Sequence, residues 1–242
     1  MKIAAITDIG SCRQENQDNY CAQQLAGGTA WGIVCDGMGG AAGGNVASST
    51  AVKVIAEPIT SSFRPGMSAN SIKNMMVSAI NAANISVYDI SCSNSELYGM
   101  GTTVVCAIVM EHTAYIAHAG DSRAYIVSHG ALTQLTRDHS VVQELVEHGK
   151  ITALEAKRHP NKNIITRAVG VSREILVDFS EQEMKDGDVL LLCTDGLTKF
   201  VESDEMCDLT KDDMFYEFAE RLVDRANKNG GGDNVTVVAV TY

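Results

Sequence analysis

Apolar residues recur at helical spacing in three parts of this chain. The clearest stripe runs through Ile72, Met75, Met76, Ala79, Ile80, Ala83, Val87 and Ile90. Such spacing places one continuous apolar face on a helix. A shorter pattern predicts a helix over Ala47–Ile59, and a third stripe predicts one from Phe215 to Ala226.

Short apolar or alternating runs between turn-rich segments predict strands. They are Lys2–Thr7, Asn19–Leu25, Thr29–Cys35, Thr102–Met110, Thr113–Ala119, Arg123–Val127, Ile175–Phe179, Val189–Cys193 and Val235–Val240. The polar links Glu111-His112 and Gly120-Asp121 are short, so the strands that they join are predicted to be antiparallel neighbours. Residues 139–157 resemble two short helices.

Blocks of antiparallel strands that alternate with helices favour an α+β fold, with sheets packed on each other and helices on the outer faces. The 242 residues contain no repeat, low-complexity tract or linker, so we expect one domain over residues 1–242. No apolar run approaches the roughly 20 residues that cross a bilayer. Residues 1–10 lack the pattern of a cleaved leader, so we expect a cytoplasmic protein.

The formal net charge of −11 argues against binding to nucleic acid or to an anionic membrane. High negative charge more often serves solubility, and it decides nothing by itself. The seven cysteines include no C-x-x-C pair. Buried free thiols in a reducing compartment are the simple explanation for Cys35, Cys106 and Cys193.

Four aspartates stand at the edges of predicted strands, each beside glycine: Asp36, Asp121, Asp195 and Asp233. One such pair is usually only a turn. If all four strand ends meet, the carboxylates repel one another unless cations neutralise them. Mg²⁺ and Mn²⁺ prefer carboxylate, carbonyl and water ligands, and the carbonyl of Gly37 suits this chemistry.

Arg13 precedes the segment Glu15-Asn16-Gln17-Asp18. Alone it is weak evidence. Beside a carboxylate and metal cluster, its guanidinium would be a phosphate clamp, because the planar fork matches phosphate oxygens.

These residues form a set of motifs in a fixed order. The set is Thr7-Asp8-Ile9-Gly10, Arg13, Asn16-Gln17-Asp18, Asp36-Gly37-Met38-Gly39-Gly40, Gly101-Thr102-Thr103, Gly120-Asp121-Ser122-Arg123, Thr194-Asp195-Gly196-Leu197 and Asp233-Asn234-Val235-Thr236. It resembles the bacterial branch of the type 2C metal-dependent (PPM) serine/threonine protein phosphatases. Arg137–Ser140 through Ile165–Ala168 resembles the flap region of that branch, which places a flap at about residues 139–165.

The resemblance implies a four-layer α-β-β-α sandwich of two antiparallel sheets flanked by helix pairs. It also implies two Mn²⁺ or Mg²⁺ ions per subunit, with a possible third and weaker site. By position, Asp36 would bridge both metals and Gly37 would give its carbonyl to one. Asp195 and Asp233 would hold the other ion. The resemblance implies roles for three further residues. Asp18 would hydrogen-bond to metal-bound waters, and Asp121 would form the third metal site with Asp195. Arg13 would bind the phosphate.

Two positions depart from the family pattern. Gln17 stands where the family usually has glutamate, which removes one charge near the metals. Met38 stands where eukaryotic members have histidine, so their proposed general acid is absent. Neither change touches a bridging ligand, so activity is expected, with weaker metal binding.

The predicted function is hydrolysis of phosphoserine and phosphothreonine in proteins (EC 3.1.3.16), by in-line attack of a metal-bridging hydroxide. The expected partners are phosphoproteins and a cognate Hanks-type Ser/Thr kinase, and the expected state is a monomer. The alternatives are an inactive phosphatase-fold regulator that binds phosphoproteins and a metal-dependent nuclease or phosphodiesterase. His118 and His139 are expected to be structural, and no motif supports a serine or cysteine nucleophile.

Overall fold

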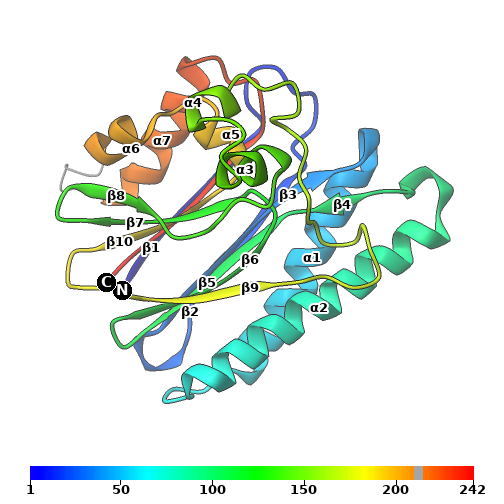
Figure 1. The fold of residues 1–242 in the computed structure, drawn as a ribbon. Helices are drawn as coiled ribbons and strands as arrows, with labels where there is room; N and C mark the ends of the chain where they lie inside the picture. The colour runs from blue at the N-terminus through cyan, green and yellow to red at the C-terminus, as the bar shows by residue number, and fades with distance from the viewer. Residues whose placement is uncertain (210–214) are drawn as a thin grey trace.

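A computed structural model describes residues 1–209 and 215–242, and its centre is a pair of antiparallel sheets (Figure 1). One sheet has five strands in the order β1 (Lys2–Asp8), β11 (Val235–Thr241), β10 (Val189–Cys193), β7 (Arg123–Ser128) and β8 (Ala131–Gln134). The other has β2 (Asp18–Gln24), β3 (Ala30–Met38), β5 (Val104–Met110), β6 (Thr113–Ala119) and β9 (Asp178–Glu183), and its short strand β4 (Gly101–Thr102) pairs with β3.

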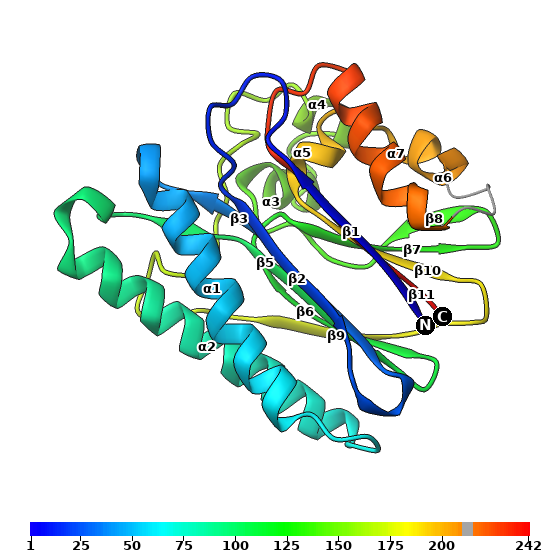
Figure 2. The ribbon, with the colours of Figure 1, turned by 180° about the vertical axis from the view of Figure 1, so that it is seen from behind.

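Helices cover the outer face of each sheet, as Figures 1 and 2 show from opposite sides. The six-stranded sheet carries α1 (Gly40–Ser62) and α2 (Ala69–Ser93), and the five-stranded sheet carries α7 (Phe215–Lys228) with the short helices α5 (Asp195–Thr198) and α6 (Ser203–Leu209). Two 3-10 turns, Ala26–Gly28 and Ser95–Leu97, complete these layers. The predicted α-β-β-α order is confirmed, although α7 is accompanied by two short helices rather than by one partner.

Three apolar layers separate the four structural layers. Val105 and Leu192 belong to the layer between the sheets, Ile108 to the layer under α1 and α2, and Val237 to the layer under α7. Strands in the middle of the sandwich are therefore buried on both faces. This explains why Val104–Met110 is a continuous apolar run rather than an alternating one.

The link Gly120-Asp121 does not form the predicted hairpin. β6 pairs with β5 and β9, whereas β7 pairs with β10 and β8, so the chain passes from one sheet to the other at this link. Gly120 has φ +118°, and an added Cβ there would lie 2.7 Å from Thr103. The prediction failed because a short link constrains distance but does not by itself fix strand pairing. Glu111-His112 does close a hairpin, with both residues at positive φ.

The predicted strand Ile175–Phe179 begins instead at Asp178, because its apolar side chains pack on the α1/α2 layer before ladder pairing starts. The two short helices predicted in 139–157 are α3 (Val141–Glu147) and α4 (Ala153–Ala156). Ser140 and Thr152 cap their first turns by accepting backbone N–H groups. All seven cysteines are free thiols, and Cys35, Cys106 and Cys193 are buried as expected. Within the described residues, none of the helices has the length and apolarity to cross a membrane.

Candidate active site

The first two acidic residues of the site face each other across a strand pair. Asp18 begins β2 and Asp36 lies in β3, directly opposite it in the register. Asp36 thus lies inside its strand rather than beyond the end. The backbone of Asp36 is fixed on both sides, because its N–H donates to Thr103 Oγ1 (2.9 Å) and its carbonyl accepts from Thr102 Oγ1 (2.8 Å).

The other sheet positions Asp195, two residues after the end of β10, and Asp233, two residues before the start of β11. Two hydroxyls near these aspartates reach across to the first pair. Thr194 and Thr236 both donate to Asp18 Oδ2, at 2.9 and 2.7 Å. Residues from both ends of the chain are therefore joined at the edge of the sandwich.

A cleft of about 500 Å³ brings the predicted residues together. Its lining includes Arg13, Asp36, Gly37, Asp121, Asp195 and Asp233. Asp18 lies beneath, 4% exposed. Of the predicted site residues, six line the cleft and the seventh supports its floor.

The crowding of carboxylates makes negative charge costly here. Burial, with the charges of Asp195 and Asp233, raises the pKa of Asp18 to about 7 despite its two hydroxyl donors. Burial and then the charge of Asp195 raise the pKa of Asp121 to about 7. The pKa of Asp36 is raised well above its ordinary value by burial and by its acidic neighbours, Asp18 first. Such a cluster favours a bound cation.

Two carboxylate oxygens support the same conclusion. Asp18 Oδ1 and Asp195 Oδ1 are buried and have no hydrogen-bond partner within the part of the chain that the structure describes. Buried oxygens are rarely left without a donor, and a cation would satisfy them. The donor set is all oxygen, which suits Mg²⁺ or Mn²⁺.

Gly37 could not be another residue. An added Cβ would lie 2.0 Å from the carbonyl oxygen of Gly44 and 2.6 Å from that of Gln17. The N–H of Gly37 donates to the Gln17 carbonyl at 3.1 Å. The backbone of β3 is therefore held close to α1 at the cleft.

Cationic side chains border the cleft on its acidic side. Arg13 Nη2 lies 2.8 Å from Asp233 Oδ1, with its side chain 53% exposed. Lys199 Nζ lies 2.6 Å from Asp195 Oδ2 and 3.0 Å from Asp233 Oδ2. The sequence interpretation missed Lys199. Its position four residues after Asp195 was the available signal, because such pairs meet on one helix face.

The loop that carries Arg13 is fastened to the site by Asn234. Its side-chain amide donates to the carbonyls of Ile9 and Glu15, and its Oδ1 accepts from the N–H of Gln17. Gln17 in turn donates to the Gly40 carbonyl at the start of α1. Gln17 thus keeps a structural contact although it lacks the charge of glutamate.

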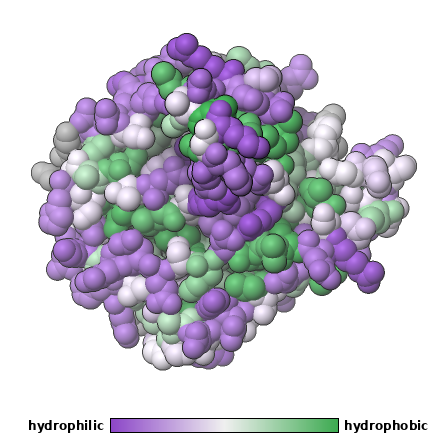
Figure 3. Space-filling model, in the orientation of Figure 1, coloured by the Kyte–Doolittle hydropathy of each residue, from purple (hydrophilic) through white to green (hydrophobic). Residues whose placement is uncertain are grey.

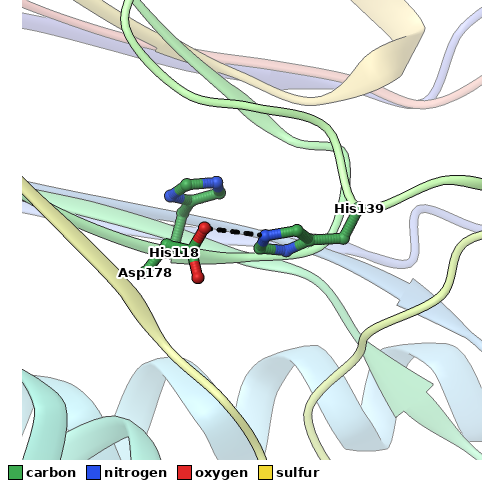
Figure 4. Close-up of side chains that lie close together, drawn as sticks. All are labelled: His118, His139 and Asp178. Atoms are coloured by element: carbon green, nitrogen blue, oxygen red, sulfur yellow. Dashed lines mark hydrogen bonds and ion pairs between the residues drawn. The ribbon is translucent and has the colours of Figure 1, made fainter. Parts of the chain in front are cut away.

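A second cluster consists of His118, His139 and Asp178 (Figure 4), with candidate ligand atoms within 4.8 Å of one another. Its atoms already have protein partners. His139 Nδ1 accepts from Gly120 N–H, so its Nε2 carries the proton toward Asp178 Oδ2. His118 Nε2 donates to the Arg137 carbonyl. We therefore interpret the cluster as support for the Gly120-Asp121 turn rather than as a metal site.

Comparison with known proteins identifies the family. The protein phosphatase 2C family model matches residues 11–236. The chain belongs to the protein phosphatase 2C family. It is 38% identical over 235 residues to the serine/threonine phosphatase stp of Listeria monocytogenes, covering 97% of this chain and 93% of that one.

Solved structures of protein phosphatase 2C type agree with this assignment. The Streptococcus agalactiae serine/threonine phosphatase matches with a TM-score of 0.93 and 32% identity, over 100% of this chain and 99% of that one. The PstP catalytic domain, solved with two manganese ions, matches with a TM-score of 0.84 and 32% identity, over 98% and 96% of the chains. The predicted fold and the predicted enzyme class, protein serine/threonine phosphatase, are confirmed.

Proposed function

We propose that this phosphatase hydrolyses phosphoserine and phosphothreonine in proteins with two divalent cations at the Asp36 cleft, and that it opposes a Ser/Thr kinase. The observation that carries the proposal is that Asp36, Asp195 and Asp233 line one cleft, where the buried oxygens Asp18 Oδ1 and Asp195 Oδ1 have no donor among the described residues. An inactive regulator would be expected to have lost one of these three ligands. The acidic lining also disfavours a nuclease, because nucleic acid needs a basic groove.

Asp36, the Gly37 carbonyl, Asp195 and Asp233 would hold the two ions, and Asp121 with Asp195 would form a weaker third site. When bound, Mn²⁺ or Mg²⁺ would activate water for in-line attack on phosphorus and neutralise charge on the phosphoryl oxygens. Asp18 would act from beneath, its position set by Thr194 and Thr236.

Arg13 would orient the phosphate. Its side chain is more than half exposed and stands over Asp233, at the mouth of the cleft. A guanidinium there can turn from the carboxylate to an incoming phosphate, which offers the same pair of oxygens. Its contribution would therefore be to binding and alignment rather than to proton transfer.

The leaving alkoxide of serine or threonine needs a proton as the P–O bond breaks. Met38 lines the cleft at the end of β3 and has no proton to give. No histidine of the described residues lines the cleft, and His118 and His139 are committed to protein contacts. Solvent water would therefore protonate the leaving group.

The chain would act as one domain with a flap at about residues 139–165. The base of this segment is closed, because Thr166 N–H donates to the His139 carbonyl and Val141 N–H donates to the Ile164 carbonyl. Between these ends, Asn163 and Ile165 reach the cleft. The substrates would be phosphoproteins, and the site would work in the cytoplasm as a monomer.

The test is hydrolysis of a phosphothreonine peptide with Mn²⁺, after chelation, and after Mn²⁺ is restored. Activity should disappear on chelation and return with the metal. Asp36→Asn should lose nearly all turnover while keeping the melting temperature within a few degrees. Full activity in excess chelator, or in Asp36→Asn, would remove the basis of the proposal.

A further inference from the structure

A second pocket opens beside the catalytic cleft, and its lining is mostly apolar. It has a volume of about 370 Å³ and is lined by Met38, Ile165, Thr166, Arg167, Ala168, Val171, Ser172, Glu174, Ile175 and Leu176. Met38 and Ile165 line the cleft as well. The two hollows are therefore adjacent, with these two side chains as their shared wall.

Gly101 lies under this shared wall. An added Cβ at Gly101 would stand 3.0 Å from Met38 Cε and 2.7 Å from Val171 Cγ2. The methionine of the cleft and the valine of the second pocket thus meet above a residue that has no side chain.

The loop that forms the pocket is firmly held. Val169 exchanges two backbone hydrogen bonds with Thr102 of β4, at 3.0 and 2.8 Å. Asn84 of α2, 1% exposed, accepts from Gly170 N–H and donates to the carbonyls of Ser172 and Arg173. A loop tied to a strand and to a helix presents its side chains in a fixed arrangement.

Of the two charged side chains in the pocket lining, Arg167 has an internal partner and Glu174 is exposed. Arg167 Nη1 donates to Asp178 Oδ1 at 2.6 Å, which also closes the loop from residue 167 to residue 178. Val171 and Leu176 nevertheless stand out in solvent, 50% and 73% exposed. Figure 3 shows apolar surface near the middle of this face of the molecule. Exposed aliphatic side chains on a held loop contribute little to the fold, and they offer area for a partner.

We propose that this pocket is a specificity subsite that receives an aliphatic side chain of the substrate, close in sequence to the phosphorylated residue. The inference rests on the proposed function, because the phosphate must occupy the neighbouring cleft. An extended peptide advances about 3.3 Å per residue, so adjacent hollows that share lining residues are reached within about two or three residues of one another. Leucine, isoleucine or methionine would fill the pocket, and an acidic side chain would lose hydration there and meet the carboxylate of Glu174.

The experiment uses the full chain with Mn²⁺ and a set of phosphothreonine peptides. The parent peptide has alanine at the three positions on each side of the phosphothreonine, and each test peptide has one of these replaced by leucine. At one position the leucine peptide should show kcat/KM about tenfold above that of the alanine parent, the lower end of the gain from burying such a side chain. At the other positions the ratio should stay near one.

Substitutions in the pocket then test whether the pocket causes the preference for leucine. Val171→Ser and Leu176→Ser should each reduce the leucine-to-alanine ratio toward one. Ile85→Ser is the matched control, because Ile85 is a 53% exposed aliphatic residue on α2 and does not line the pocket. It should keep the wild-type ratio. Leu176→Lys should shift the preference at the same position from leucine to glutamate.

Failure of this inference differs from failure of the proposed function. If wild type cleaves every peptide equally, or if the pocket variants keep the full ratio as Ile85→Ser does, the pocket is not a subsite although the enzyme is a phosphatase. If wild type cleaves neither these peptides nor p-nitrophenyl phosphate with Mn²⁺, the proposed function itself is wrong.

Discussion

The ammonium group of Lys199 lies 2.6 Å from the carboxylate of Asp195, four residues before it, and 3.0 Å from that of Asp233. Burial acts to lower the pKa of Lys199, but the carboxylates of Asp195 and Asp233 outweigh it and raise the pKa above its ordinary value, so the side chain stays charged at neutral pH. A fixed positive charge therefore stands beside two of the three carboxylates that are proposed to hold the two ions. It lowers the net negative charge that attracts a divalent cation.

Replacing Lys199 should therefore strengthen metal binding. We expect Lys199→Met to bind Mn²⁺ roughly 5- to 30-fold more tightly, about 1–2 kcal/mol for removing a partly exposed charge pair. Isothermal titration calorimetry would measure this. Lys199→Arg, which keeps the charge, and Lys185→Met, on an exposed turn outside the cleft, should retain the wild-type affinity. Equal affinity in Lys199→Met would show that the lysine does not oppose the metal.

Arg13→Ala should weaken substrate and phosphate binding. Loss of a charge-assisted bidentate contact costs on the order of 2–3 kcal/mol, or roughly 30–150-fold. The effect should appear in KM and in inhibition by inorganic phosphate. Lys53→Ala, an exposed residue of α1, controls for net charge. The clamp assignment fails if kcat/KM and phosphate inhibition both stay at wild-type values.

Met38→His should help alkyl leaving groups more than aryl ones. An aryl oxide with electron-withdrawing groups leaves without a proton, whereas a serine alkoxide needs one. General acid catalysis contributes typically about 10²–10⁴-fold where it is used. The comparison is kcat on phosphopeptide and on p-nitrophenyl phosphate across pH, with metal content checked. A histidine limb in the wild-type profile, or no gain for alkyl over aryl substrates, would place the acid elsewhere.

Shortening the flap should change the choice of protein substrate. The closed base at His139 and Thr166 allows residues 150–161 to be replaced by a glycine-serine linker without cutting a strand. We expect a larger change in kcat/KM on phosphopeptides than on p-nitrophenyl phosphate. Equal changes on both substrates would mean that the segment serves the catalytic cleft instead.

Protonation of His139 should lower the free energy of unfolding at acid pH. Burial first, then neighbouring His118 and Arg167, lower its pKa, although Asp178 acts in the other direction. The folded protein holds the ring neutral, because Nδ1 must accept from Gly120 N–H. The contribution of neutral His139 to the free energy of unfolding is present in full above about pH 6.5, the ordinary pKa of histidine. It is lost as the pH falls through the lower pKa that His139 has in the folded protein.

Urea unfolding of wild type and His139→Gln between pH 7.5 and 5 would measure it. The variant should be less stable at pH 7.5 but should lose less free energy of unfolding on acidification. Parallel curves for the two proteins would assign the acid loss to other groups.

Sequence patterns predicted the strands correctly where both faces of the strand are buried. Val189–Cys193 and Thr113–Ala119 were predicted with their observed bounds, because strands buried on both faces are continuous apolar runs. β8, Ala131–Gln134, was missed because it is an edge strand with mostly exposed side chains. The β6–β7 link was misread because pairing across two sheets depends on tertiary packing. Lys199 and the second pocket depend on side-chain positions that no local pattern specifies.

The placement of the acidic residues against two different sheets has a consequence for unfolding. Asp36 lies in one sheet, and Asp195 and Asp233 flank strands of the other. A metal ion shared among them would therefore cross-link two layers that otherwise touch through apolar side chains and through hydrogen bonds such as those from Thr194 and Thr236 to Asp18. Such a cross-link acts as a disulfide does, because it joins residues far apart in the sequence. Metal loading would thus make the unfolding of the two sheets one cooperative event, and the enzyme would be most resistant to proteolysis when it is ready to act.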